Sequence, residues 1–395
     1  MDRSGDAEAV LDLQPNSSIS VAYHPDFGPH DDLLLLELDE KLLPDVLCER
    51  VSLRGEPDEE AVFCTHSKTY GIKFVGTSNS VFLIPPTNTL SFPKNAMNVD
   101  CDEQKFDKPA SISVLKVASG NLELVEVAPR LDKLKLLLLQ KPFSIEEVSE
   151  MDTYSGSEEH IFVYRWDDLI GRIQASDSEL RLGLEALNAL EINGFWRILD
   201  DKCIDSVLNM LLHNAVLNDW SFDALPENEV VSVMESDGFP SKLSTHCLRV
   251  YGSKVDNNDH DGVSLWKLNE KEVCLHFARR ILRNGKVKKD KFLVEWNSKI
   301  PRGMHTRFEM LEGEVLTERI GVEIWIHAFS VSSLPSTPAE RFSILFKERP
   351  KWELKDLDPY IRDLKVPGLS SEALLLKYTR RSQPRPDVEP IFSAR

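Results

Sequence analysis

The sequence predicts an α+β protein, in which a β-rich amino-terminal region is followed by a series of small helical units. Three observations predict this fold class. Short apolar or alternating segments separated by turn residues fill the first 128 residues, as in a barrel or sandwich. After Pro129 the apolar residues recur with the helical period. The helical segments come in groups, and each group ends in a short apolar or aromatic strand.

The amino-terminal region, residues 1–128, is predicted to contain short strands joined by turns. Ser119-Gly120 is expected to turn the chain between the last two strands, and residues 87–110 are expected to form a loop. No self-closing pattern of strands is evident. The expected strands are Ser18–Tyr23, Leu33–Leu38, Ala61–Thr65, Tyr70–Val75, Ser80–Ile84, Ser111–Val117 and Asn121–Val127.

Residues 129–202 are predicted to form a winged-helix unit, because three helical segments precede a turn and an aromatic strand. The expected helices are residues 131–138, Trp166–Gln174 and 176–190. Ser176 and Glu179 have the spacing of a capping box at the start of the third helix. Asn193-Gly194 is expected to end that helix and lead into the strand Phe195–Leu199, with Trp196 buried.

Similar groups recur along the rest of the chain, although their sequences are not alike. Residues 203–334 are predicted to hold one or two winged-helix units, and residues 335–395 a last one. Each group spans roughly sixty to seventy residues, which suits one small domain. The strands expected to close these groups are Ser264–Leu268, Val322–Phe329 and Val388–Phe392.

A highly charged stretch in the last group, 340-ERFSILFKERPKWELKDLDPYIRDL-364, holds six acids and six bases. It is either a site for chemistry or the core of a small domain with a solvated face. Phe342 and Phe346 are at helical spacing, and so are Leu357 and Ile361. This spacing favours a core, with the charges on the opposite face available for binding.

Composition excludes several classes of protein. The chain of 395 residues is 42% hydrophobic and carries a net charge of −18, so it is globular and is not a general nucleic-acid coat protein. A local basic patch on an acidic body stays open. The six cysteines form no CxxC pair, the chain opens with no signal-peptide pattern, and its apolar runs are too short to span a bilayer. We expect no membrane association and a reducing compartment, cytosol or nucleus.

No arrangement of residues predicts catalysis, a metal site or a cofactor. The stretch 256-DNNDHDGVSLWKLNE-270 fails as a calcium loop, because Asn257 and Leu268 occupy its first and twelfth positions. No phosphate loop, nucleophile elbow or metal-binding helix motif is present. Four histidines have a cysteine within about ten residues, but nearness in sequence does not build a dyad. They are His66, His213, His246 and His276.

Two basic groups are candidate DNA contacts. The run 279-RRILRNGKVKKDK-291 has seven bases and one acid. It either binds phosphates or is a solvated helix end and loop, where the helix dipole favours cations; the second interpretation is favoured. Its candidate residues are Arg279, Arg280, Arg283, Lys286, Lys288, Lys289 and Lys291.

The second basic group lies near the carboxyl terminus. Its residues are Lys377, Arg380, Arg381 and Arg385. Lys377 and one of the two adjacent arginines are expected to share a face of the third helix of the last group, the helix that a winged helix commonly places in the major groove.

Several segments together resemble the family of the sister chromatid cohesion subunit Dcc, which belongs to an alternative replication factor C-like clamp loader. The resemblance covers most of the chain apart from residues 1–30 and 87–110. The segments that carry it are 35-LLELDE-40, 53-LRGEPDEEAVFCTHSKTYGIK-73, 172-RIQASDSEL-180, 185-EALNALEINGFWRIL-199 and the charged stretch at 340–364.

The resemblance implies a non-catalytic, nuclear scaffold for DNA replication, the cell cycle and sister chromatid cohesion. It implies that the β-region completes a barrel with a small partner subunit and the carboxy-terminal tail of the large loader subunit. It implies three winged-helix units, whereas four helical groups are counted here. It also implies contacts with the catalytic subunit of DNA polymerase epsilon and with DNA, and only an indirect link to the sliding clamp. The alternative is a tandem winged-helix adaptor that binds proteins and no DNA.

Overall fold

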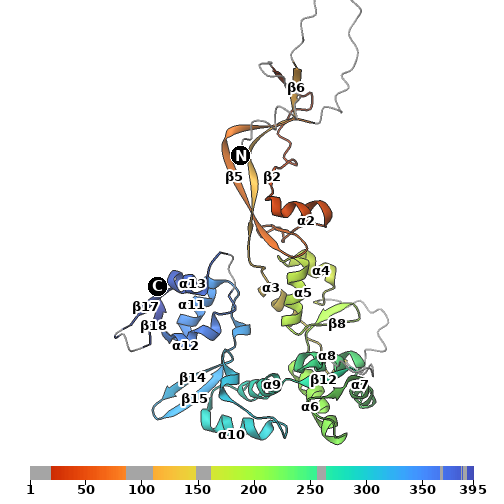
Figure 1. Ribbon diagram of the computed structural model, residues 1–395, viewed down its shortest axis with the longest axis vertical. Helices are drawn as coiled ribbons and strands as arrows, with labels where there is room; N and C mark the ends of the chain where they lie inside the picture. Colours follow the sequence, from red (N-terminus) through yellow and green to blue (C-terminus); the bar gives the residue numbers. More distant parts are fainter. Residues whose placement is uncertain are drawn as a thin grey trace, which may run out of the picture. The chain divides into compact units, whose positions relative to one another are not determined.

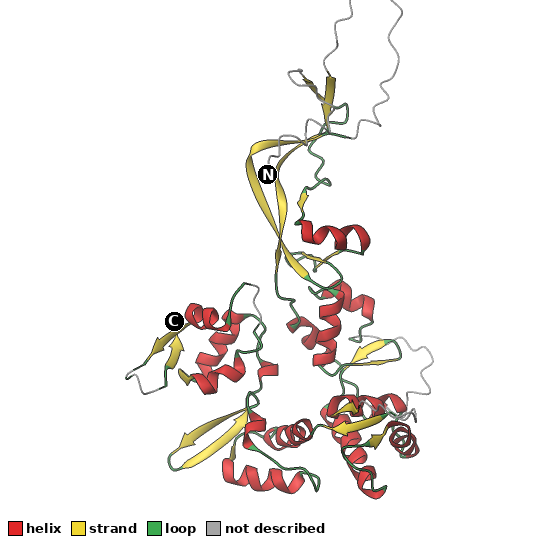
Figure 2. Ribbon diagram, in the orientation of Figure 1, coloured by secondary structure: helices red, strands yellow, loops and turns green. Residues whose placement is uncertain are grey.

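The computed structural model describes residues 19–85, 110–147, 162–255, 264–364, 368–383, 385 and 389–395. The chain divides into two compact units. The first comprises Met1–Val51 and Tyr70–Glu126, and the second comprises Ser52–Thr69 and Val127–Arg395. Figure 1 shows the elements of each unit, and Figure 2 shows mainly strands with one short helix in the first and mixed helices and strands in the second, which confirms the α+β class.

The first unit is built on long, curled strands. β5 (Thr69–Leu83) runs antiparallel to β7 (Lys116–Glu126), and β2 (Leu36–Glu37) pairs with β7 in parallel. Farther along, β1 (Ile19–Tyr23) pairs in parallel with β6 (Ala110–Val114). The short helices η1 (Glu40–Leu42) and α2 (Leu43–Cys48) follow β2.

The turn expected at Ser119-Gly120 is wrong, because both residues lie inside β7. Gly120 pairs with Gly76 of β5, and the register shifts between Gly76 and Val81. A Cβ atom on Gly120 would lie 2.3 Å from the carbonyl oxygen of Val75. Glycine is therefore required by the close approach of two backbones at a bulge that bends the strand pair.

The second unit begins with a hairpin and a first helical group. The hairpin consists of β3 (Ser52–Arg54) and β4 (Val62–Cys64). The first group comprises α3 (Asp132–Leu139), α4 (Trp166–Arg172), α5 (Asp177–Ala186), β8 (Leu190–Ile192) and β9 (Phe195–Arg197). Its core contains Leu134, Leu169, Leu180 and Leu184, and Trp196 packs on it half-buried.

The predicted capping box at the start of α5 is confirmed. Ser176 accepts from the backbone N–H of Glu179, whose carboxylate accepts from the N–H of Ser176. The helix does not reach Asn193-Gly194 as expected, because it ends at Ala186. Asn193 and Gly194 have φ of 52° and 83°, and they form the two-residue turn of the β8–β9 hairpin.

The β3–β4 hairpin docks on α5 through buried polar groups. The side chain of Arg54 is 6% exposed; it donates to the carbonyl oxygen of Ala175 and pairs with Asp177. The hydroxyl of Thr69 donates to the Glu179 carboxylate at 2.6 Å and accepts from the N–H of Ser176 at 2.9 Å. Arg54 of the hairpin and Thr69 at the start of β5 thus both bind the start of α5, and the segment Ser52–Thr69 belongs to the same unit as the first helical group.

Replacing Arg54 with methionine is expected to destabilise the second unit by about 2–3 kcal/mol. The change leaves the Ala175 carbonyl without its donor and Asp177 without its counter-ion. Urea unfolding of the full chain, followed by circular dichroism, measures the loss. Arg172→Met is the matched control, because the side chain of Arg172 is 49% exposed and its ion pair with Glu56 is long, at 3.7 Å. This change should alter stability by less than about 0.5 kcal/mol.

Three further groups share one order of elements, helix–strand–helices–strand–strand. The first of them comprises α6 (Asp201–Leu217), β10 (Leu225–Pro226), α7 (Glu227–Ser236), α8 (Ser241–Tyr251), β11 (Gly252–Val255) and β12 (Leu265–Leu268). The next comprises α9 (Glu270–Leu282), β13 (Val287–Lys288), α10 (Lys289–Lys299), η4 (Phe308–Leu311), β14 (Val315–Ile320) and β15 (Glu323–Ala328). A short 3₁₀ helix, η5 (Val331–Ser333), follows.

The last group comprises α11 (Pro338–Glu348), β16 (Lys351–Glu353), α12 (Leu354–Leu357), η6 (Asp358–Tyr360), α13 (Ser371–Tyr378), β17 (Thr379–Ser382) and β18 (Ile391–Ala394). In each of these three groups the last strand lies between the other two. The sheet orders are β10-β12-β11, β13-β15-β14 and β16-β18-β17.

The apolar cores do not follow the groups one to one. The second and third groups share one continuous core, which includes Trp266, Phe292 and Trp296. The last group forms a separate core around Phe342 and Trp352, which also includes Leu316 of β14. The core interpretation of the charged stretch at 340–364 is therefore confirmed, with Trp352 on strand β16.

Candidate nucleic-acid and partner interfaces

The basic run at 279–291 is largely neutralised by carboxylates of its own surroundings. Arg279 forms a bidentate salt bridge with Glu314, with N···O distances of 2.6 and 3.0 Å. Two more arginines face α6: Arg283 lies 3.0 Å from Asp201 and 3.2 Å from Asp205, and Arg280 lies 3.7 Å from Asp205. Lys286, just before β13, pairs with Glu318, and Lys288 on β13 lies 2.6 Å from Glu323.

Two lysines of this run have no carboxylate partner among the described residues. Lys289 lies 4.0 Å from the ring centroid of Phe308, in a cation–π interaction that partly stabilises its charge. Lys291 is exposed on α10. The run therefore offers a phosphate far less positive charge than its composition indicates.

The carboxy-terminal basic group lies on a strand rather than on one helix. α13 ends at Tyr378, and Arg380 and Arg381 belong to β17, so the expected helix face shared with Lys377 is wrong. The break occurs at Thr379, whose backbone is extended and whose hydroxyl donates to the carbonyl oxygen of Leu375 at 2.6 Å. This bond satisfies a helix-end carbonyl while the chain turns into the sheet.

The charges of this second group are not compensated. In the described residues, no carboxylate lies within ion-pair distance of Lys377, Arg380 or Arg385, and all three are exposed. Arg381 donates to the side-chain oxygen of Gln383 at 3.0 Å. Lys377 lies 5.3 Å from the ring centroid of Tyr378. These side chains remain available to an external anion.

Another cation, Lys351, joins this surface through the sheet. Ser393 of β18 pairs with Arg380 on one side and with Lys351 of β16 on the other. Residues directly opposite in an antiparallel sheet project from the same face, so these three side chains form a row. Sequence reasoning missed Lys351, although its alternation with the buried Trp352 indicates an outward side chain.

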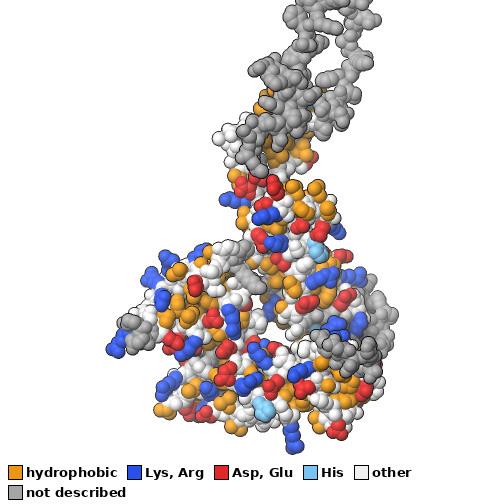
Figure 3. Space-filling view, in the orientation of Figure 1, with side chains coloured by type: hydrophobic (Ala, Val, Ile, Leu, Met, Phe, Trp, Pro, Cys, Tyr) orange, Lys and Arg blue, Asp and Glu red, His pale blue; other side chains and the backbone are white. Residues whose placement is uncertain are grey.

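The first unit exposes many apolar side chains, and some of them are visible on the face drawn in Figure 3. On β5, Phe74 is 58% and Phe82 is 50% exposed, and on β1 Tyr23 is 73% exposed. Other exposed apolar residues of this unit are Val21, Phe27, Leu33, Leu34, Leu36, Leu43, Leu47, Val81, Val117 and Val125. Exposed apolar strands of this extent mark a surface for another chain.

The buried thiols are protonated at neutral pH and are poor nucleophiles. Burial raises the pKa of Cys203 to about 12 and that of Cys274 to about 11, and it also raises the pKa of Cys247. In the part of the chain that the structure describes, no three His, Cys, Asp or Glu side chains are placed to hold a metal ion. Most of the rejected calcium loop, residues 256–263, lies outside the described residues.

One buried polar chain links the second and third helical groups. The hydroxyl of Tyr251 on α8 lies 2.8 Å from Nδ1 of His276 on α9, whose Nε2 lies 2.8 Å from the carboxylate of Asp205 on α6. A neutral imidazole accepts at Nδ1 from the tyrosine hydroxyl, whereas Nε2 and the Asp205 oxygen are close but not aligned for a hydrogen bond. Burial lowers the pKa of His276 to about 4 against the opposing effect of Asp205, and the nearby Arg283 and Arg280 act in the same direction as burial.

We expect acid to destabilise the second unit between about pH 6.5 and 4. Burial also lowers the pKa of His246 to about 4. The unfolded chain, in which a histidine has a pKa near 6.5, then binds protons before the folded chain does, so stability falls as pH falls through this window. Melting temperatures at pH 7.5 and 5 measure the loss.

His246→Gln should reduce the difference between the two melting temperatures, because it removes one proton acceptor that only the unfolded chain exposes. His305→Gln is the control, because the His305 side chain is 82% exposed. An equal pH dependence in all three proteins would contradict the assignment.

These surfaces define the chain as a multi-unit α+β protein with an apolar strand surface in one unit and an uncompensated basic surface in the other. No helix within the described ranges is long and apolar enough to cross a membrane.

Comparison with known proteins identifies the family. The family model of sister chromatid cohesion protein Dcc1 matches residues 33–361. Sister chromatid cohesion protein DCC1 of Danio rerio is 34% identical over 384 residues, covering 94% of this chain and 91% of the relative. The protein of that name in Homo sapiens is 32% identical, covering 89% and 86%, and the one in Saccharomyces cerevisiae is 20% identical, covering 93% and 97%. This chain belongs to the Dcc1 family.

Proposed function

We propose that this chain acts in sister chromatid cohesion as a non-catalytic, nuclear scaffold subunit of an alternative replication factor C-like clamp loader. Membership of the Dcc1 family supports the role in cohesion. The observation that carries the scaffold role is the exposed apolar strand surface of the first unit. Buried, protonated thiols offer no nucleophile that would favour an enzymatic role instead.

In this proposal the first unit is completed by strands from the small partner subunit and the carboxy-terminal tail of the large loader subunit. Among the described residues, β1 and β6 form a sheet of two strands, and two-stranded sheets are marginally stable alone. Pairing with partner strands would satisfy their open edges and cover the apolar side chains. A fragment of residues 1–128 made alone is then expected to aggregate.

Charging the apolar strand surface should abolish assembly. Phe74→Glu together with Phe82→Glu places two carboxylates where partner strands would bury apolar rings, so both partner subunits should no longer co-purify with the chain. The same variant made alone should be more soluble than the wild type. Leu376→Glu, at a leucine of α13 that is 72% exposed, is the matched control and should assemble normally. Unchanged co-purification of the double variant would contradict the proposal.

We further propose that the helical groups are winged-helix domains. The repeated order of elements and the central position of the last strand in three of the sheets support this assignment. In the last group the hairpin β17–β18 then corresponds to the wing. We propose that DNA is contacted by this hairpin and the sheet face behind it, rather than by α13 alone, because the uncompensated cations lie there.

Replacing Lys377, Arg380 and Arg381 by alanine should weaken DNA binding without unfolding the last group, because surface changes cost little stability. On duplex DNA, the slope of log affinity against log salt should become shallower by about 0.9 for each phosphate that the variant no longer binds. Fluorescence anisotropy with a labelled duplex at several salt concentrations measures this slope.

Replacing Lys286, Lys288 and Lys289 is the matched control, because two of these lysines are already paired with glutamates. Its salt slope should stay close to that of the wild type. If the control changes the slope and the carboxy-terminal variant does not, DNA binds at the 279–291 run instead. If neither does, the alternative function is favoured, an adaptor that binds proteins and no DNA.

The remaining partners follow from the scaffold role. The helical unit would hold the catalytic subunit of DNA polymerase epsilon and DNA beside the loader while the loader places the sliding clamp, which this chain would contact only indirectly. Polymerase binding that survives the carboxy-terminal alanine substitutions would show that DNA and polymerase use different surfaces.

A further inference from the structure

The third helical group has an open strand edge. β14 lies at the edge of its sheet and pairs only with β15, and the two are joined by the short turn Gly321-Val322. In a hairpin with a two-residue turn the flanking pair, Ile320 and Glu323, is hydrogen-bonded, and bonded and non-bonded pairs alternate from there. The backbone groups of Val315, Thr317 and Arg319 therefore point away from the sheet.

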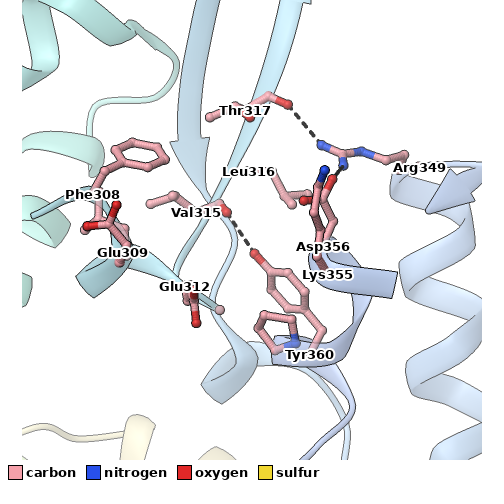
Figure 4. Close-up of a pocket in the computed structure, with 13 residues that line it drawn as sticks. Phe308, Glu309, Glu312, Val315, Leu316, Thr317, Arg349, Lys355, Asp356 and Tyr360 are labelled. Carbon is pink, nitrogen blue, oxygen red and sulfur yellow. Dashed lines mark hydrogen bonds and ion pairs between the residues drawn. The ribbon is translucent and has the colours of Figure 1, made fainter. Parts of the chain in front are cut away.

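Two of these outward carbonyl groups already accept hydrogen bonds, but from side chains. The hydroxyl of Tyr360 donates to the carbonyl oxygen of Val315 at 2.8 Å, and the guanidinium of Arg349 donates to that of Thr317 at 2.9 Å (Figure 4). No described residue accepts from the N–H of Thr317 or Arg319. The edge thus has acceptors and donors arranged as a strand presents them.

A cavity lies beside this edge. Its volume is about 290 Å³, and it lies between β14 and the α12–η6 segment of the last group (Figure 4). Pockets for ligands typically measure about 300–1,000 Å³, so this one accommodates a few side chains rather than a whole domain. Its walls include Phe308, Leu311, Leu316 and Pro359.

Around the cavity, the basic side chains have carboxylate partners, whereas one of the acidic side chains has no basic partner among the described residues. Arg349 is engaged by Asp356 at 3.0 Å, and Lys355 by Glu353 at 2.7 Å. Glu309 has no cationic partner among the described residues, and Glu312 has only Arg362, 3.7 Å away. Glu309 is therefore the carboxylate of the cavity that is left for a basic ligand, although Lys289 lies over the ring of Phe308 beside it.

From this geometry we propose that the β14 edge and its cavity bind an extended basic peptide segment of another protein by strand addition. The backbone of the segment would pair with Thr317 and Arg319, and one of its N–H groups would replace the side-chain donor of Arg349, while the buried Tyr360 would keep its bond to Val315. Its alternate side chains would enter the cavity, and a lysine or arginine would face Glu309. This surface is separate from the strands of the first unit and from the basic sheet face of the last group.

The test uses the full chain and a phage-displayed library of random dodecapeptides, followed by fluorescence polarisation with the selected synthetic peptides. We expect enriched sequences to combine a β-branched run with a terminal Lys or Arg. Thr317→Pro removes one outward N–H at a position where an edge strand tolerates proline, and it should weaken binding about tenfold or more. Thr317→Val keeps the N–H and is the matched control, with unchanged affinity.

Glu309→Gln should weaken binding a few-fold, with the effect shrinking at high salt. Circular dichroism checks that each variant is folded, and if Thr317→Pro is not, Arg319→Pro removes the next outward N–H. An unenriched library, or peptides that bind both proline variants as tightly as the wild type, would overturn the proposal. Tyr360 and Arg349 would then serve only to block the strand edge.

Discussion

The hydrogen bonds around Thr69 hold the start of the second unit together, because they join its first segment, Ser52–Thr69, to the first helical group. Thr69 is the first residue of β5, and its hydroxyl is bound by the Glu179 carboxylate and the N–H of Ser176 at the start of α5. The side chain of Thr69 therefore joins the amino-terminal cap of α5 to the first residue of β5. Arg54 secures the same helix start from the neighbouring hairpin. Two segments that are more than a hundred residues apart in sequence are fixed by a few buried polar groups.

Local signals in the sequence were sufficient where neighbouring residues decide the structure. The capping box of Ser176 and Glu179 located the start of α5, and the apolar spacing located the core of the last group. Dipeptides that end in glycine were harder to interpret, because Asn193-Gly194 and Ser119-Gly120 carry similar turn signals. The first forms a hairpin turn, whereas Gly120 is required by the backbone of Val75, a partner that is distant in sequence. Such a contact leaves no local pattern.

The basic groups show the same limit for charge. The run at 279–291 is conspicuous in sequence, yet its acids come from α6 and β14–β15, where no spacing rule would place them. The weaker carboxy-terminal group keeps its charge because no described carboxylate approaches it. Its partner Lys351 is found only through strand register, since Ser393 separates it from Arg380. On an acidic chain, the number of basic residues in a segment is therefore a poor guide to whether that segment can bind phosphate.

The shared core of the second and third helical groups has a consequence for how the domains of this chain are counted. Topology gives separate units, each with its own sheet, but Trp266 of one and Trp296 of the other belong to one apolar cluster. The buried contacts of Tyr251, His276 and Asp205 cross the same boundary. Neither group can lose its core without exposing that of its neighbour, so the two should melt in a single cooperative transition. The number of cooperatively unfolding units in the described helical part of the chain is therefore one smaller than the number of its sheets.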